Sequence, residues 1–322
     1  MKYGELKKSL INGVDPVYIL SGSDDFLRNY AVRLIKEKCV SLPEINFLSA
    51  DGENMTAESF EAVYTSLKTF PFLSDKRMVV LKEYYPTADE LRKNGLLSYL
   101  KDPVETTVLV INNRKESRSL EKAEGATRVD CNPEMPLCIS WIFGEAKKSG
   151  LKISAAVAEK IAEYCLLDFT KINGETQKLI DYCAGDGEIT LSAVNEIVHK
   201  DGEYRIYEMV ESISAGKTEE AYGILADLIA KNESEQKLFI SIYSHFRRML
   251  HVAVSDAKNS ELAEVLGVKE YSVKMTRQQA KKFSAGRIKR ICDKFSEYDE
   301  KFKKGDSSLS AVLWKGVFYA MI

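Results

Sequence analysis

The chain has 322 residues, with 46 basic and 48 acidic side chains and a formal net charge of −2. At about one domain per 150 residues, this length predicts two or three domains. The 45% apolar content excludes a disordered chain, and the charge balance excludes a protein that is basic throughout. We expect no membrane span and no signal peptide. Six scattered cysteines without a Cys-x-x-Cys pair are typical of buried thiols in a reducing cytoplasm, where we expect the protein to be.

Short β-rich runs alternate with helix-like stretches in the first part of the chain. The β-rich runs cover residues 17–20, 45–48, 78–81, 107–111 and 127–130, and the helix-like stretches cover 25–38, 56–68 and 89–100. Strands that alternate with helices imply a mainly parallel sheet covered on both faces. We therefore predict one five-stranded α/β domain over residues 1–134.

Beyond Pro133 and Pro136 the pattern becomes helical, with no convincing strand. A small helical domain is predicted over residues 135–201, with helices at 137–149, 154–166, 171–184 and 190–199. Its breaks are expected at Gly150, Asn173-Gly174 and Gly185-Asp186-Gly187, and Ser192 is a candidate cap for its last helix. Residues 202–322 carry apolar stripes at helical spacing, which predict a compact bundle with helices at 206–213, 221–229, 239–250, 260–266, 275–283, 286–303 and 307–321.

The turn after the first strand, Leu20–Arg28, lies where phosphate-binding loops occur. Such a loop needs Gly-x-x-x-x-Gly-Lys-[Ser/Thr], but this turn has one glycine, no lysine, and the acidic pair Asp24-Asp25. The third strand ends in Lys82-Glu83, with Lys82 where a magnesium-binding acid would stand. We therefore predict an ATPase scaffold without ATPase chemistry, with no catalytic residue, cofactor or metal. Asp24-Asp25 is expected to be a solvated helix start. A divergent P-loop NTPase remains the alternative.

The segment Thr69–Arg77 places Phe72 and Leu73, two large apolar residues, in a turn that begins at Pro71. Two interpretations remain open. The side chains could fold back onto the domain core, or they could form a hydrophobic plug for the pocket of a partner.

Residues 269–304 contain twelve Lys and Arg against five Asp and Glu, an excess of seven positive charges. One interpretation is a solvated helix face. The other is contact with a nucleic-acid backbone, for which Lys281, Lys282, Arg287, Lys289 and Arg290 are the candidates. A stand-alone DNA-binding protein is therefore a second alternative.

Several segments in order along the chain resemble the delta subunit family of the bacterial DNA polymerase III clamp loader. They are Pro16–Leu27, Phe70–Val80, Asn173–Leu179, Glu208–Ile213 continuing to Leu228, and Leu266–Val273. Each match is modest, but their succession spans most of the chain. Gly174 departs from the family pattern, and there is no Ser-Arg-Cys arginine-finger motif.

The resemblance implies an AAA+-like three-domain subunit that neither binds nor hydrolyses ATP: an α/β domain, a small helical domain and a C-terminal helical collar. It also implies that the α/β domain grips the ring-shaped sliding clamp (the beta subunit) and helps to open it. The contact residues would be Phe72 with Pro71 or Leu73. The collar would join the other loader subunits in a hetero-pentamer, and primed DNA would lie within that assembly.

Overall fold

The computed structural model describes residues 1–230 and 234–322, without the side chain of Lys122. The chain divides into two units. The first consists of Met1–Glu145 and Asp168–Gly174, and the second of Ala146–Leu167 and Glu175–Ile322. The division into three domains that we drew from the sequence stays a prediction.

The first unit is built on a parallel sheet with the strand order β2-β3-β4-β1-β5. Its strands are β1 (Val17–Ser21), β2 (Phe47–Asp51), β3 (Arg77–Lys82), β4 (Thr107–Asn113) and β5 (Thr127–Asp130). The predicted five-stranded parallel sheet is thus confirmed. The second strand begins two residues later than expected, because Pro43 starts a short helix, α3 (Pro43–Asn46), in which proline's fixed φ suits the first turn.

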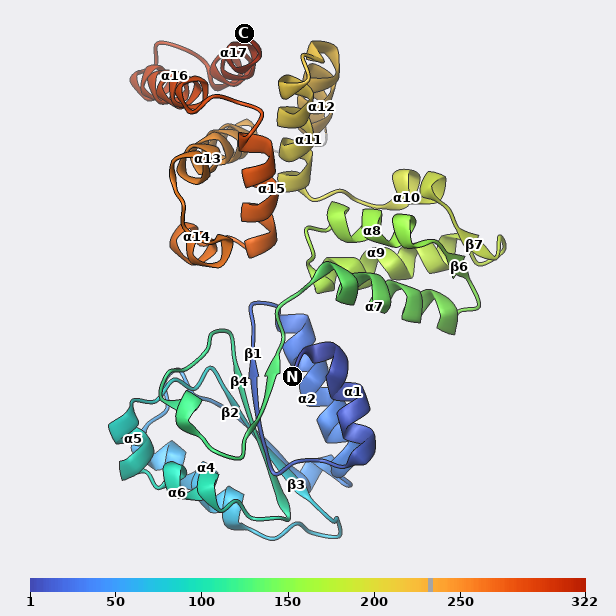
Figure 1. Cartoon of the computed structure of the whole chain (residues 1–322), viewed down its shortest axis with the longest axis vertical. Coiled ribbons are helices and arrows are strands. Elements are labelled where there is room, and N and C mark those ends of the chain that lie inside the picture. Colours follow the sequence, from blue (N-terminus) through green and yellow to red (C-terminus); the bar gives the residue numbers. More distant parts are fainter. Residues whose placement is uncertain (231–233) are drawn as a thin grey trace. The chain divides into compact units, whose positions relative to one another are not determined.

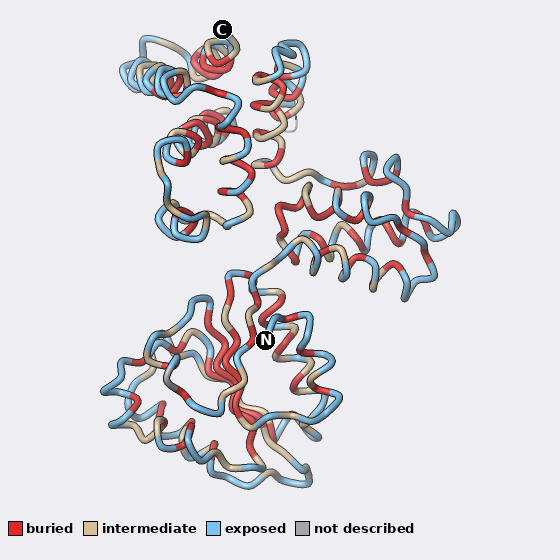
Figure 2. Tube along the Cα trace, in the orientation of Figure 1, coloured by how far each residue is buried: buried red, intermediate tan, exposed pale blue. Residues whose placement is uncertain are grey.

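Helices cover both faces of this sheet (Figure 1). One face carries α1 (Tyr3–Asn12) and α2 (Asp25–Cys39), and the other carries α4 (Ala57–Lys68), α5 (Ala88–Lys93) and α6 (Leu96–Lys101), while a short 3-10 helix (Leu120–Lys122) precedes β5. The central strands β3 and β4 are buried almost throughout (Figure 2), which explains their continuous apolar sequence. The helix α1 was not predicted. The expected helix over 89–100 is wrong as one element, because Gly95 interrupts it with φ 76°.

Residues 135–201 contain α7 (Met135–Lys148), α8 (Ala155–Tyr164), α9 (Phe169–Tyr182) and α10 (Leu191–Ile197). The expectation of helices alone is wrong, since β6 (Lys152–Ile153) pairs in parallel with β7 (Glu188–Ile189). The expected break at Asn173-Gly174 is also wrong, because α9 runs through it. The cap of α10 is Thr190, whose side chain accepts a hydrogen bond from the Ala193 amide, and not Ser192.

The start of α9 belongs to the first unit because its aromatic residue packs there. The Phe169 ring lies edge-on to Trp141 of α7, with 5.8 Å between centroids, and stacks on Phe26 of α2 at 6.4 Å. Aromatic pairs at such distances add to the energy of area burial.

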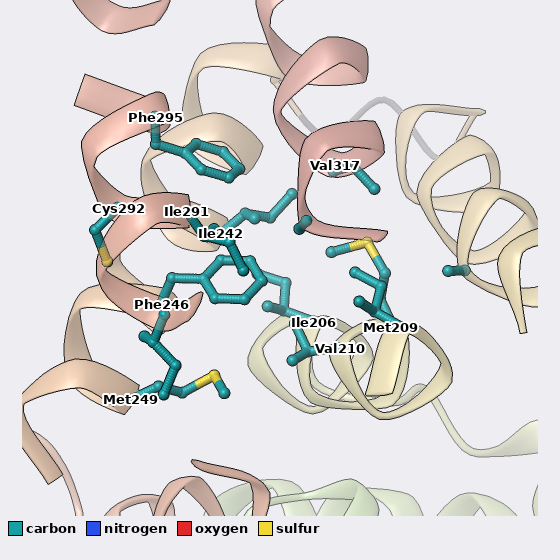
Figure 3. Close-up of a cluster of buried hydrophobic side chains, with 14 of the residues drawn as sticks. Ile206, Met209, Val210, Ile242, Phe246, Met249, Ile291, Cys292, Phe295 and Val317 are labelled. Atoms are coloured by element: carbon teal, nitrogen blue, oxygen red, sulfur yellow. The ribbon is translucent and has the colours of Figure 1, made fainter. Parts of the chain in front are cut away.

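The predicted C-terminal bundle is confirmed. It consists of α11 (Gly202–Ser214), α12 (Thr218–Ala230), α13 (Glu235–Val254), α14 (Asn259–Leu266), α15 (Glu270–Ala280), α16 (Ala285–Lys304) and α17 (Leu309–Met321). Its core draws apolar side chains from α11, α13, α16 and α17 (Figure 3). Gly316 of α17 permits close packing, because a Cβ at this position would stand 2.8 Å from the ring of Phe295.

A buried polar chain crosses this core. His245 on α13 has its Nε2 atom 2.6 Å from Oε1 of Gln279 on α15, and Gln279 Nε2 donates to the Tyr207 carbonyl on α11 at 2.9 Å. Since Gln279 donates through its nitrogen, its oxygen accepts the proton of the imidazole. Burial lowers the pKa of His245 to about 4, so the ring is neutral at pH 7.

Candidate functional site

The loop between α4 and β3 presents large apolar side chains to solvent. Phe72 is 58% exposed and Leu73 is 76% exposed, and Phe70 beside them is exposed as well, while Pro71 is half-buried. The two side chains therefore do not fold back onto the core. Since the strands are parallel, this loop lies at the amino edge of the sheet, where each strand begins. We call residues 69–76 the contact loop.

The main chain of the contact loop is held by Asn46, the buried last residue of α3. The Phe72 amide donates to Asn46 Oδ1 at 2.8 Å, and Asn46 Nδ2 donates to the Phe72 carbonyl at 2.9 Å. Asn46 Nδ2 also donates to the Ser41 carbonyl at 2.9 Å. The carboxamide thus pairs with both polar groups of Phe72, as a neighbouring strand would.

Further bonds secure the rest of the contact loop. The Ser41 amide donates to Ser74 Oγ at 3.1 Å, and Ser74 Oγ donates to the Lys76 carbonyl at 2.8 Å. On the other side, the Arg77 guanidinium donates through Nη2 to Ser66 Oγ at 2.8 Å. Leu73 itself has φ 49°, a left-handed conformation that is uncommon for leucine. Neighbours on both sides therefore hold the strained turn in place.

Two more exposed apolar residues lie on the segment that carries Asn46. Leu42 precedes α3 and Ile45 lies within it, and both side chains are exposed. The sequence does not identify them, because the β-rich run 45–48 predicts a strand there. The signal that could have identified them is Pro43, which favours the first turn of a helix.

The turn after β1 lies at the opposite, carboxyl edge of the sheet and is occupied by the chain's own contacts. A Cβ at Gly22 would stand 2.4 Å from the carbonyl carbon of Cys131, so only glycine fits there. Asp24 caps α2 by accepting from the Leu27 amide at 3.0 Å, and it also accepts from the Phe169 amide at 3.1 Å. Asp24 is buried, so the expectation that the Asp24-Asp25 pair is solvated is wrong for Asp24.

Arg28 and Glu83 form a second set of internal contacts at this edge. Arg28 is buried, and its Nη1 atom donates to Glu83 Oε1 at 2.9 Å. Glu83 also accepts from the Tyr85 hydroxyl at 2.6 Å and from the Arg114 amide at 3.2 Å. Desolvation raises the pKa of Glu83, but the hydrogen bonds from Tyr85 and Arg28 outweigh it and hold the pKa below its usual value. The only acid at the end of the Lys82-Glu83 strand is therefore a structural ion-pair partner.

Three of the five candidate DNA contacts are already engaged. Lys282 forms an ion pair with Glu211, and Lys289 pairs with Asp293 one turn along α16 at 2.7 Å. Arg287 donates to the Ala320 carbonyl at 2.9 Å.

Lys281 and Arg290 differ from these three. Both side chains are exposed, and neither forms an ion pair within residues 1–230 and 234–322. Nearby acidic residues of α16 instead pair with other lysines, such as Glu297 with Lys294 and Lys301. The basic surface that stays available for phosphates is therefore narrower than the sequence count indicates.

Among the residues that the structure describes, no helix is both long and apolar enough to cross a membrane. No three His, Cys, Asp or Glu side chains gather there as potential metal ligands.

Comparisons with known proteins cover both ends of the chain. Residues 18–129 match the family model described as "DNA polymerase III, delta subunit", and residues 203–313 match the model for the C-terminal domain of the same subunit. The DNA polymerase III subunit delta of Bacillus subtilis is 25% identical over 328 residues, covering 95% of this chain and 93% of that protein. The Escherichia coli subunit is 21% identical over 240 residues, covering 70% and 67%. The solved DNA clamp loader delta protein of Bacillus subtilis superposes with a TM-score of 0.77 at 24% identity, covering 99% of this chain and 98% of that one, which shows a shared fold.

Proposed function

Because the chain belongs to the DNA polymerase III delta subunit family, we propose that its contact loop binds the sliding clamp and helps to open it. In this proposal the AAA+-like domain of residues 1–134 grips the clamp, and residues 135–201 form a small helical domain. Residues 202–322 form the collar that joins the other loader subunits in a hetero-pentamer. The assembly acts in the cytoplasm and places the ring on primed DNA during replication.

The observation that carries this proposal is the exposure of Phe72 and Leu73 on a braced loop. A few apolar anchors supply most of the energy of a typical protein interface, provided that they enter a pocket of the partner. Phe70 on the same loop, and Leu42 and Ile45 on the segment hydrogen-bonded to it, are further exposed apolar residues, which supports an apolar cleft as the complementary surface. Pro71 contributes by fixing the direction in which the chain enters the tip.

The proposed action is mechanical. A ligand shifts a conformational equilibrium only by its different affinities for the two states. The contact loop must therefore bind the clamp more tightly when one ring interface is open than when the ring is closed. Binding energy at the loop then offsets part of the cost of separating the clamp subunits.

The internal contacts at the carboxyl edge support a role without nucleotide. Arg28 is paired with Glu83, and the buried cap Asp24 accepts from the Leu27 and Phe169 amides. An active NTPase would need these groups for phosphate and magnesium. Binding of ATP by the purified chain in equilibrium dialysis would favour that alternative.

Contacts with DNA are proposed to be secondary and to occur within the loader. Of the five candidates, Lys281 and Arg290 are the ones without an ion pair among the described residues, and two charges supply little affinity by themselves. Salt-dependent binding of primed DNA by the chain alone would instead favour a stand-alone DNA-binding protein.

The test of clamp opening uses two forms of the sliding clamp from the same organism as this chain. One is the closed ring, and the other is a variant made monomeric by a charge substitution at the ring interface. Titration calorimetry should give a lower Kd for the monomeric variant. Equal affinities would refute opening but retain the contact, and no binding to either form would refute the contact as well.

A further inference from the structure

Asn46 is joined to the tip of the contact loop although 26 residues separate it from Phe72. Its carboxamide is buried, and all three of its hydrogen bonds go to main-chain groups: the amide and carbonyl of Phe72 and the carbonyl of Ser41. No bond in this set involves the side chains that reach solvent. Asn46 therefore determines the path of the loop and leaves its exposed side chains free.

We propose that Asn46 is the positioning residue of the clamp contact, an inference that rests on the proposed function of the loop. It holds the main chain of Phe72 so that the side chains of Phe72 and Leu73 project before the clamp arrives. A loop ordered in advance loses less conformational freedom on binding, which preserves affinity. The left-handed conformation of Leu73 is disfavoured for leucine, and the bonds of Asn46 to the adjacent Phe72 main chain help to hold the turn.

The expected size of the effect follows from the fraction of molecules whose loop is in the binding conformation. The apparent Kd equals the intrinsic Kd divided by that fraction. If removal of the brace leaves about one molecule in ten with the loop in place, Kd rises about tenfold. The side chains that touch the clamp are unchanged in this variant.

The chain offers a closely matched control. At the opposite edge of the sheet, buried Asn113 makes the same reciprocal pair with another residue: the Tyr84 amide donates to Asn113 Oδ1 at 2.9 Å, and Asn113 Nδ2 donates to the Tyr84 carbonyl at 2.7 Å. Asn113→Ala thus removes a comparable buried carboxamide brace, but from a loop that takes no part in the proposed contact.

The experiment measures the Kd of the full chain for the sliding clamp in wild type, Asn46→Ala, Asn113→Ala and the tip variant Phe72→Ala with Leu73→Ala. We expect Asn46→Ala to raise Kd about tenfold and Asn113→Ala to leave it within about twofold. Hydrogen exchange provides a second readout, because the Phe72 amide should lose protection in Asn46→Ala and keep it in Asn113→Ala. If Asn46→Ala does not fold, Asn46→Asp replaces it. That variant keeps the acceptor for the Phe72 amide but loses the two donated bonds, so the same direction of change is expected.

Each outcome has a separate meaning. Wild-type Kd in Asn46→Ala, together with lost binding in the tip variant, would overturn the positioning role and leave the proposed function intact. An equal loss in Asn46→Ala and Asn113→Ala would also overturn it, because the effect would then be general. Wild-type binding by the tip variant would instead overturn the proposed contact itself.

Discussion

Replacing Phe72 and Leu73 together by alanine removes the exposed apolar tip of the contact loop, and the structure gives the size of the expected effect. Burying either side chain fully is worth about 1.5–3 kcal/mol. Only the fraction that is exposed in the free chain, 58% for Phe72 and 76% for Leu73, can be newly covered by a partner. Complete coverage of both is therefore worth about 2–4 kcal/mol, which corresponds to a rise in Kd of roughly 30- to 1,000-fold.

Titration calorimetry of the full chain against the sliding clamp measures this change directly. Val265 on α14 is 81% exposed, so Val265→Ala is a control that truncates a solvent-facing apolar side chain far from the loop in sequence, although it removes less surface than the tip variant. The control should leave Kd unchanged, and neither variant should shift the thermal unfolding midpoint, because the replaced side chains have few neighbours to lose. A rise in Kd of less than about threefold in the tip variant would show that the pair is not the anchor.

Two further predictions concern the second unit. Lys281→Ala with Arg290→Ala should weaken binding of primed DNA by the assembled loader and reduce the slope of log K against log salt by about 1.5–2. The matched double variant Lys282→Ala with Lys289→Ala, whose lysines are already paired, should change the slope less, and an equal effect of the two double variants would contradict a contact through the unpaired residues. The buried imidazole of His245 has a pKa of about 4, against 6.5 in the unfolded chain. As pH falls from 6.5 to 4, the unfolded state therefore takes up a proton before the folded state does. The free energy of unfolding decreases by up to about 3 kcal/mol over this range. Urea denaturation should show this decrease in wild type and not in His245→Gln, and parallel pH profiles would rule out His245 as its source.

The sequence predicted the elements whose signal lies in their own residues. Strands β3 and β4 read as continuous apolar runs because helices cover both faces of the sheet. The stripes of α11, α12 and α13 predict helices because each helix buries one face in a shared core. Strands β6 and β7, with two residues each, are too short to show any period.

Features that depend on distant partners could not be read in this way. Asn173-Gly174 predicts a break, but α9 continues through it, since a glycine costs a helix only roughly 1 kcal/mol. Asp24 was expected to be solvated, because its partner amide at Phe169 lies 145 residues away.

The same distinction, between signals local to a residue and signals from distant partners, applies to the residues of the candidate site. Phe72 and Leu73 could be identified because two large apolar residues in a polar turn are conspicuous in the sequence itself. Asn46 could not, because an asparagine within an apparent strand gives no indication that it bonds to a loop 26 residues later. The basic residues can be counted in the sequence, but only the structure distinguishes Lys281 and Arg290 from their paired neighbours.

The contact loop is held by a buried carboxamide, that of Asn46, whereas its exposed side chains, Phe72 and Leu73, take no part in those bonds. This separation bears on how such a protein could change its binding partner. Because Asn46 bonds only the main chain of Phe72, substitutions of the Phe72 side chain can alter which partner is recognised without disturbing the path of the backbone. Variants or relatives could therefore acquire a new binding preference through one or two surface changes. Libraries randomised at the outward positions of the loop should therefore remain folded.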